Sequence, residues 1–304
     1  MSDTNVPAAG FRAGYAAIVG CPNVGKSTLM NRLIGTKVSI TSKKAQTTRH
    51  RIHGILTTDT CQYVFVDTPG IQMRHRNALN RAMNRAVSGA LADIDVILFV
   101  IEANRWRAED RAVLARLPAN IPVVLVISKI DRMTDKNALL PFMAMLAEQH
   151  AFSEIVPTSA ERGDNLDTLL QVAARYLPEA APIFDRDDLT DRSERFLAAE
   201  LLREKLFRNL GEELPYGIAV EIERFEIEEG EGGVRRIHAA IIVDRDAHKA
   251  IVIGKGGERM KRVASDARKD MERLFGGKVW LETWVKVKGG WADDERALKS
   301  LGYE

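Results

Sequence analysis

Gly20-Cys-Pro-Asn-Val-Gly25-Lys26-Ser27 matches the pattern G-x-x-x-x-G-K-[ST]. Residues 15–19 before it are short and apolar, as in a buried parallel strand, and residues 28–34 have helical spacing that ends at Gly35. Glycines let backbone N–H groups approach a phosphate chain, and the helix N-terminus adds partial positive charge. The stretch therefore predicts a loop that binds the phosphates of a nucleoside triphosphate. The alternative is an ordinary glycine-rich turn.

Two side chains of this loop have predicted roles. Lys26 would reach the β- and γ-phosphates, and the Ser27 hydroxyl would be a ligand of Mg2+. The residues expected to bind nucleotide here are Gly20, Cys21, Pro22, Asn23, Val24, Gly25, Lys26, Ser27 and Thr28.

Composition limits the class of protein. A chain of 304 residues suits two domains, and 45% hydrophobic with 28% charged residues is ordinary for a soluble protein. Two cysteines cannot form a disulfide framework, which favours a reducing cytoplasm. The N-terminus lacks the pattern of a signal peptide, and the longest apolar runs have only strand length. The net charge of +2 means that any basic surface must be local.

A basic loop is predicted over residues 37–51, which carry five cationic residues and no acidic one. A threonine in such a loop can place its hydroxyl on Mg2+ and its N–H on the γ-phosphate, so that the loop orders when that phosphate is present. Thr48 is the first candidate and Thr47 the second. The alternative is a solvated basic loop with neutral hydroxyls.

Asp67-Thr68-Pro69-Gly70 follows an expected strand at residues 62–66. Asp67 could hold Mg2+ through water, and the Gly70 N–H could meet the γ-phosphate; a plain turn is the alternative. Ile71 stands where many switch GTPases have a glutamine that orients the attacking water, so intrinsic hydrolysis should be slow. The predicted metal ligands are Ser27, Thr48 and Asp67.

A base-recognition motif is expected at Ser128-Lys129-Ile130-Asp131, where GTP-binding switches have Asn-Lys-x-Asp. Asp131 would accept hydrogen bonds from the guanine N1–H and 2-amino group, which adenine cannot offer together. Lys129 would lay its stem over the base. Ser128 lacks the asparagine amide, which can bond the phosphate loop and the base at once, so affinity should fall. In Thr158-Ser159-Ala160, the Ala160 N–H would meet guanine O6.

The C-terminal half has a different order of elements. A helix with a capping box from Asp191 to Glu194 is expected after a linker. Two strands, a second helix, the loop Gly254-Lys255-Gly256-Gly257, a basic helix and a final strand are expected to follow. This order is typical of a bacterial-type KH domain, whose Gly-x-x-Gly loop clamps about four nucleotides of single-stranded RNA. A charged helix after a glycine-rich turn is the alternative. The expected RNA contacts are Ile253, Gly254, Lys255, Gly256, Gly257, Lys261 and Arg262.

Three tryptophans of this half could stack on bases. Trp280 and Trp284 have strand spacing, however, and are therefore expected in the core; Trp291 is the third.

Together, these motifs resemble the Era family of translation-factor-type GTPases, over about residues 12–304. The resemblance implies an α/β P-loop GTPase domain, with a mostly parallel sheet and helices on both faces, followed by an α+β type II KH domain. The expected segments are an N-terminal tail 1–12, a GTPase domain 13–178, a linker 179–192 and a KH domain 193–304. The catalytic residues implied are Lys26, Thr48, Gly70 and Asn23.

The same resemblance implies partners. These are GTP and GDP, the single-stranded 3′ end of 16S ribosomal RNA, and the 30S subunit, whose assembly and rRNA processing the protein would assist. It also implies a cytoplasmic protein with loose contact to the inner membrane. Related GTPases with a phosphate-loop asparagine can use K+ in place of an arginine finger, and Asn23 occupies that position. The alternative is that Asn23 is a loop residue that bonds its own backbone.

Two other classes stay open at this point. One is an enzyme that transfers phosphate to a small molecule, against which stands the lack of a second acid–base cluster. The other is a passive RNA-binding module whose nucleotide only stabilises the fold. A monomer is the default expectation.

Overall fold

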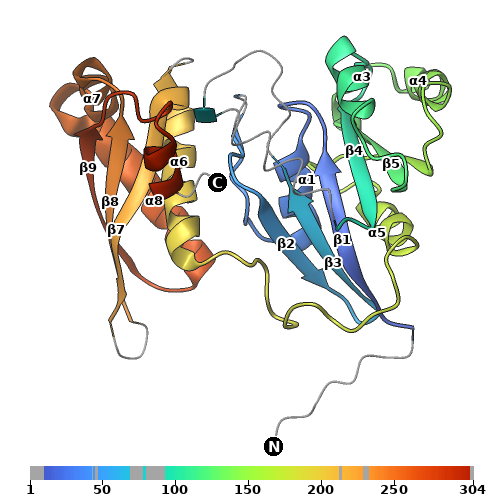
Figure 1. Cartoon of the computed structure of the whole chain (residues 1–304), viewed down its shortest axis with the longest axis horizontal. Coiled ribbons are helices and arrows are strands. Elements are labelled where there is room, and N and C mark those ends of the chain that lie inside the picture. The colour runs from blue at the N-terminus through green and yellow to red at the C-terminus, as the bar shows by residue number, and fades with distance from the viewer. Residues whose placement is uncertain are drawn as a thin grey trace, which may run out of the picture. The chain divides into compact units, whose positions relative to one another are not determined.

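The computed structural model describes residues 10–42, 44, 47–68, 78–79, 93–211, 214–228 and 233–301. The chain divides into two compact units (Figure 1). Among these residues, the first unit holds 10–39, 50–68 and 93–191, and the second holds those of 40–49, 78–79 and 192–301.

The first unit is built on a six-stranded sheet in the order β2-β3-β1-β4-β5-β6. Its strands are β1 (Arg12–Val19), β2 (Ile52–Thr57), β3 (Cys61–Asp67), β4 (Val96–Glu102), β5 (Val123–Ser128) and β6 (Glu154–Pro157). Only β2 of these strands pairs antiparallel, with β3. β4 and β5 are buried along almost their whole length, which explains their uninterrupted apolar sequences. The expected mostly parallel sheet is confirmed.

The described helices of this unit are α1 (Lys26–Ile34), α3 (Ala108–Leu114), α4 (Leu139–Ala147) and α5 (Leu166–Ala174). α1 follows β1 directly and buries Leu29, Met30 and Leu33. It ends at Gly35, whose φ of 81° suits glycine at a helix C-terminus. The phosphate loop therefore joins the carboxyl end of a buried strand to the start of a helix.

The second unit has a three-stranded sheet of β7 (Ile218–Ile227), β8 (Arg235–Val243) and β9 (Val279–Val287), with β8 in the centre. β7 runs antiparallel and β9 parallel to β8. α6 (Glu194–Asn209) and α8 (Glu258–Phe275) pack against each other and against this sheet (Figure 1). α7 (Asp246–Ile253) precedes α8, and α9 (Glu295–Ser300) lies near the C-terminus. Their shared core includes Leu202, Leu206, Ile241, Val263 and Met271. This is the expected KH fold.

The N-cap predicted for α6 was wrong. Ser193, and not Asp191, caps the helix, because its hydroxyl accepts a hydrogen bond from the Phe196 N–H at 3.3 Å. Asp191 instead lies 3.0 Å from Nδ1 of His53. Glu194 forms an ion pair with Arg235 at 2.7 Å. The helix begins two residues later than the sequence pattern indicated, because the Ser193 hydroxyl, directly before Glu194, takes the capping role.

The prediction of a core position was wrong for Trp280, which is 41% exposed. Val279 and Val285 of β9 belong to the core, so strand alternation turns Trp280 and Trp284 to the opposite face. There their rings lie 5.2 and 6.2 Å from that of His238. Trp291, by contrast, is buried and donates from Nε1 to the Gly217 carbonyl at 3.2 Å.

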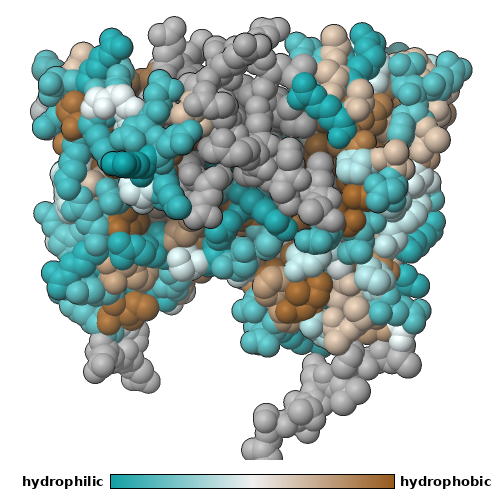
Figure 2. All heavy atoms as spheres, in the orientation of Figure 1, coloured by the Kyte–Doolittle hydropathy of each residue, from teal (hydrophilic) through white to brown (hydrophobic). Residues whose placement is uncertain are grey.

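Figure 2 shows hydrophobic residues in small separate groups among hydrophilic ones on the face that it presents. Within the described part of the chain, none of the helices combines the length and apolar character needed to cross a membrane.

Candidate functional site

The phosphate loop owes its path to positions where side chains do not fit. A Cβ at Gly20 would lie 2.3 Å from the Val100 carbonyl oxygen, so only glycine allows this approach to β4. Gly25 caps α1 with a φ of 108°, in the left-handed region that favours glycine. Asn23 also has a positive φ, of 66°. The loop brings backbone N–H groups to the N-terminus of α1, where an anion is stabilised.

Lys26 is held inside this loop. Its side chain is buried, and Nζ donates hydrogen bonds to the carbonyls of Gly20 and Cys21, each at 2.9 Å. Burial lowers the pKa of Lys26, whereas the negative charge of Asp67 opposes that shift. A buried ammonium gains from a nearby anion, so the loop is suited to a phosphate chain.

Asp67, at the end of β3, accepts hydrogen bonds from two hydroxyls at the predicted magnesium site. Its Oδ2 accepts hydrogen bonds from Ser27 Oγ at 2.7 Å and from Ser39 Oγ at 2.9 Å. Asp67 and Ser39 are fully buried. Hydroxyl and carboxylate oxygens are hard ligands of the kind that Mg2+ prefers, so these residues fit that ion. The described residues contain no cluster of three or more His, Cys, Asp or Glu side chains that could hold a metal ion.

Ser39 was missed by the sequence reasoning. Asn31 of α1 fixes it, because Asn31 Oδ1 accepts from the Ser39 N–H at 2.9 Å and Nδ2 donates to the Ser39 carbonyl at 2.6 Å. The only signal in the sequence was a small hydroxyl residue in the loop after the phosphate-loop helix, which does not single it out. Thr68, the next predicted contact, is buried and donates from Oγ1 to the Ile18 carbonyl at 3.1 Å.

The base-recognition residues come from the ends of β5 and β6. Ser159 Oγ donates to Asp131 Oδ1 at 2.6 Å, which orients the carboxylate expected to select guanine. Lys129 adopts a positive φ of 60° and donates from Nζ to the Asn23 carbonyl at 2.6 Å, across to the phosphate loop. Thr158 and Ser159 are buried, whereas Ala160 is half-buried. The structure thus brings this motif and the phosphate loop together.

Ser128 retains one function that an asparagine would perform there. Its hydroxyl lies 2.6 Å from the carbonyl oxygen of Val24 in the phosphate loop and 2.8 Å from that of Ile101 in β4. The loop therefore remains tied to the end of β5, although the amide is missing.

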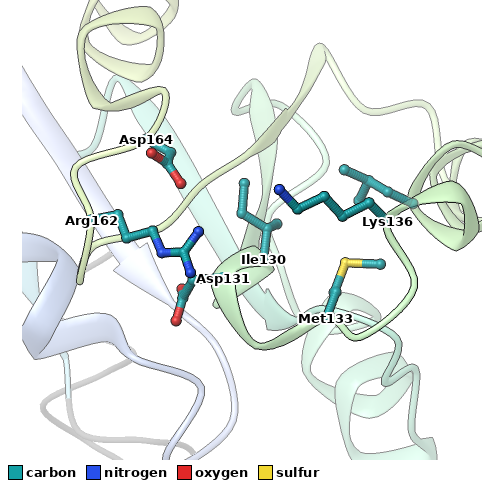
Figure 3. Close-up of a pocket in the computed structure, with 7 residues that line it drawn as sticks. Ile130, Asp131, Met133, Lys136, Arg162 and Asp164 are labelled. Carbon is teal, nitrogen blue, oxygen red and sulfur yellow. The ribbon is translucent and has the colours of Figure 1, made fainter.

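A pocket opens beside Asp131 (Figure 3). Figure 3 shows the Arg162 guanidinium next to the Asp131 carboxylate, and the Lys136 side chain extending toward Ile130. The residues that line the pocket are Ile130, Asp131, Met133, Lys136, Leu139, Arg162 and Asp164. The pocket adjoins the residue expected to bind the base edge.

Thr47 and Thr48 group with the second unit. Thr47 Oγ1 donates to the Lys44 carbonyl at 2.7 Å, and Arg203 of α6 donates to the Thr47 carbonyl at 2.6 Å. Thr48 is buried. The loop expected to sense the γ-phosphate is therefore held by a KH-unit helix.

Further contacts fix the same loop on α6 and on the start of β7. Glu204 Oε1 accepts from Thr41 N at 3.0 Å and from Thr41 Oγ1 at 3.1 Å. Lys44 Nζ donates to the carbonyl of Phe207 at 2.6 Å and also to that of Leu210, so it caps the C-terminal end of the helix. Arg49 donates to the Ile218 carbonyl at 2.8 Å.

Pro69, Gly70 and Ile71 lie outside the described residues. The predictions made for these residues stay predictions.

The Gly-x-x-Gly loop joins α7 to α8, as expected. Gly254, Gly256 and Gly257 all have positive φ, and a Cβ at Gly254 would lie 2.8 Å from that of Arg259. Lys255, Lys261 and Arg262 are exposed.

Ile253 is half-buried and packs on the core at the end of α7. Ile251, which the sequence reasoning did not single out, is 45% exposed beside this loop. Helical periodicity could have indicated this exposure. The helix turns Val252 into the core, where it is fully buried, and its neighbour Ile251 therefore points away from the core.

The first unit and its site define a P-loop GTPase domain, and the second defines a KH domain. Family models agree with both: residues 15–129 match the family described as 50S ribosome-binding GTPase, and residues 213–292 match the KH domain family.

Similar proteins match nearly the whole chain. GTPase Era of Nitrosomonas eutropha is 61% identical over 297 residues, which cover 98% of this chain and 99% of that protein. GTPase Era of Neisseria meningitidis is 55% identical over 297 residues, which cover 97% of this chain and 96% of that protein. The chain belongs to the GTPase Era family and is a GTPase.

Solved structures of Era are also similar. A variant of Aquifex aeolicus Era bound to GDP and AlF4− has a TM-score of 0.92 and 42% identity, with 96% of this chain and 99% of that chain covered. Era in complex with MgGDPNP and nucleotides 1506–1542 of 16S ribosomal RNA gives the same TM-score, identity and coverage.

Proposed function

We propose that this GTPase is a switch that binds 16S ribosomal RNA near its 3′ end, and that it assists rRNA processing and assembly of the 30S subunit. Its full-length similarity to an Era that holds both MgGDPNP and 16S rRNA nucleotides supports this function. The proposed RNA contacts are Ile253, Gly254, Lys255, Gly256, Gly257, Lys261 and Arg262.

The proposed nucleotide site combines the motifs of the first unit with the basic loop. Lys26 and the N-terminus of α1 would bind the phosphates, while Asp131, oriented by Ser159, would select guanine. Ser27, Asp67 and Thr48 would hold Mg2+, which neutralises phosphate charge when bound. The Gly70 N–H would contact the γ-phosphate. Because Ile71 cannot orient water, slow intrinsic turnover is expected.

Two hydrogen bonds near the start of the basic loop support coupling between nucleotide and RNA. Ser39 donates to Asp67 of the magnesium site, and two residues later Thr41 donates to Glu204 of α6. A nucleotide that draws Thr48 toward its γ-phosphate would pull on a loop that α6 and Ile218 now hold. We therefore propose that the contacts of α6 differ between the GTP and GDP states.

The test is titration of a short RNA from the small-subunit 3′ end into the full chain, with GDP and then with a non-hydrolysable GTP analogue, at fixed salt. Different affinities in the two states are the expected result. Equal affinities would contradict a switch and favour a passive RNA-binding module. Transfer of phosphate to a small molecule, with no RNA binding, would favour the enzyme alternative.

We also propose that K+ activates hydrolysis through Asn23. This residue is exposed in the phosphate loop, and its carbonyl accepts from Lys129. Faster hydrolysis in potassium than in sodium buffer is expected for the wild-type chain, and Asn23→Ala should abolish the difference. Equal rates of the wild-type chain in the two buffers would contradict the proposal.

Finally, we propose a cytoplasmic monomer with peripheral contact to the inner membrane, and the domain boundaries 13–178 and 193–304 around the linker 179–192. The basic residues of α8 are the surface that would favour anionic lipid. Sedimentation at micromolar concentration tests the monomer, flotation with anionic vesicles tests the membrane contact, and limited proteolysis within 179–192 tests the linker.

A further inference from the structure

Position 128 has a hydroxyl whose proton is already used. Ser128 is buried, and its Oγ lies 2.6 Å from the Val24 carbonyl and 2.8 Å from the Ile101 carbonyl. Both neighbours are acceptors, and a hydroxyl carries a single proton. That proton therefore goes to one of the two carbonyls.

An asparagine at this position would behave differently. Its amide has two N–H donors, so that one can bond the phosphate loop while the other reaches the base. Beyond the N1–H and 2-amino group that Asp131 would bind, the major-groove edge of guanine offers the acceptors O6 and N7. The Ala160 N–H is the expected donor to O6. Ser128 has no donor left for N7.

Lys129, the neighbouring cation, is also engaged. Its Nζ donates to the Asn23 carbonyl at 2.6 Å and lies 3.3 Å from Glu102 Oε2. These contacts hold the ammonium on the phosphate-loop side of the motif.

We infer that this GTPase recognises guanine without using N7, so that it accepts guanine nucleotides altered at that atom. The inference rests on GTP binding through Asp131, as proposed above. Its ligand class is 7-deazaguanine nucleotides, which keep the N1–H, the 2-amino group and O6 but carry carbon in place of N7. Position 128 would determine this tolerance.

The experiment measures displacement of a fluorescent GDP from the full chain by GDP, 7-deaza-GDP and IDP. For the wild-type chain, the Kd of 7-deaza-GDP should lie within about twofold of that of GDP. In Ser128→Asn, the Kd of 7-deaza-GDP should be about fivefold that of GDP, because one hydrogen bond of about 1 kcal/mol to N7 is lost. IDP lacks the 2-amino group, so it should bind more weakly than GDP to both proteins.

Ser128→Thr is the matched control, because it keeps one hydroxyl and should keep a ratio near one. It also preserves the test if Ser128→Asn does not fold. A ratio of fivefold or more for the wild-type chain or for Ser128→Thr would overturn the inference, as would an unchanged ratio in a folded Ser128→Asn. Equal binding of IDP and GDP would instead contradict the role of Asp131, which distinguishes that failure from failure at N7.

Discussion

Asp67 shows how single residues prepare the phosphate site. Ser27 and Ser39 both donate to one of its oxygens, and Asn31 holds the Ser39 backbone in place. A buried carboxylate is stable only when such donors surround it, so the site is organised by residues of the phosphate-loop helix and of the loop that follows.

Removal of the Ser39 hydroxyl tests that support. Ser39→Ala should lower the free energy of unfolding by about 1.5 to 3 kcal/mol, because a buried hydrogen bond to a charged group is lost. Urea denaturation of both proteins measures this change in the free energy of unfolding. Ser300→Ala, which removes an exposed hydroxyl on α9, is the control and should change stability by less than about 0.5 kcal/mol. Equal effects of the two substitutions would contradict the role of Ser39.

Cys21 should be chemically inert although it lies in the phosphate loop. Burial raises the pKa of its thiol to about 12, and Asp110 adds to the shift through a hydrogen bond and its charge. The reactive thiolate is therefore scarce at pH 8. Iodoacetamide at pH 8 should label the native chain slowly and the urea-unfolded chain rapidly, as mass spectrometry of the Cys21 peptide would show. Rapid labelling of the native chain would contradict the burial.

At the scale of elements, the turn between α7 and α8 carries the proposed RNA contact. Three positive-φ glycines shape it, and Lys255 is exposed at its centre. α8 then places Val263, Ala267 and Met271 in the core and leaves its basic residues outside, so one helix supplies both the packing and the charged surface.

Lys255→Ala should weaken RNA binding and reduce its salt dependence. Loss of one phosphate contact should lower the slope of log K against log salt by about 0.7 for single-stranded RNA. Fluorescence anisotropy at several salt concentrations measures this slope. Lys299→Ala, at an exposed lysine of α9, should leave the slope unchanged. The proposed RNA site is wrong if both variants keep the wild-type slope.

For the whole molecule, the basic loop is the segment that we propose links the nucleotide and RNA functions. It leaves the first unit at Ser39, bonds α6 through Thr41 and Thr47, and returns to the first unit at His50. We therefore propose that a change at one end of this loop alters the contacts at its other end, which requires that the loop has two arrangements.

Glu204→Gln tests this link. It removes the charge that holds Thr41 and Arg208, so the loop should leave α6 more easily. The difference in RNA affinity between the GDP and GTP-analogue states should then fall by at least about twofold. Titration of the same RNA measures it, with Glu295→Gln on α9 as the control. An undiminished difference in Glu204→Gln would contradict coupling through this loop.

The amino-acid sequence was sufficient to predict the fold class, the strand–loop–helix order around the phosphate loop and the order of the KH elements, because each depends on residues close together in the chain. The guanine motif was also read from adjacent residues, and it stays a prediction. Glycine spacing, apolar runs and helical periodicity are local signals. Their positions agree with β1, α1, β5 and α8 within a few residues.

Which distant groups meet became clear from the folded chain. The contacts of Ser39 with Asp67 and of Ser128 with Val24, and the attachment of Thr41 to Glu204, join residues separated by 28, 104 and 163 positions. The outward position of Trp280 was likewise settled by which face of β9 covers the core. Local patterns carry no information about such partners, because side-chain hydrogen bonds and burial depend on how the whole chain packs.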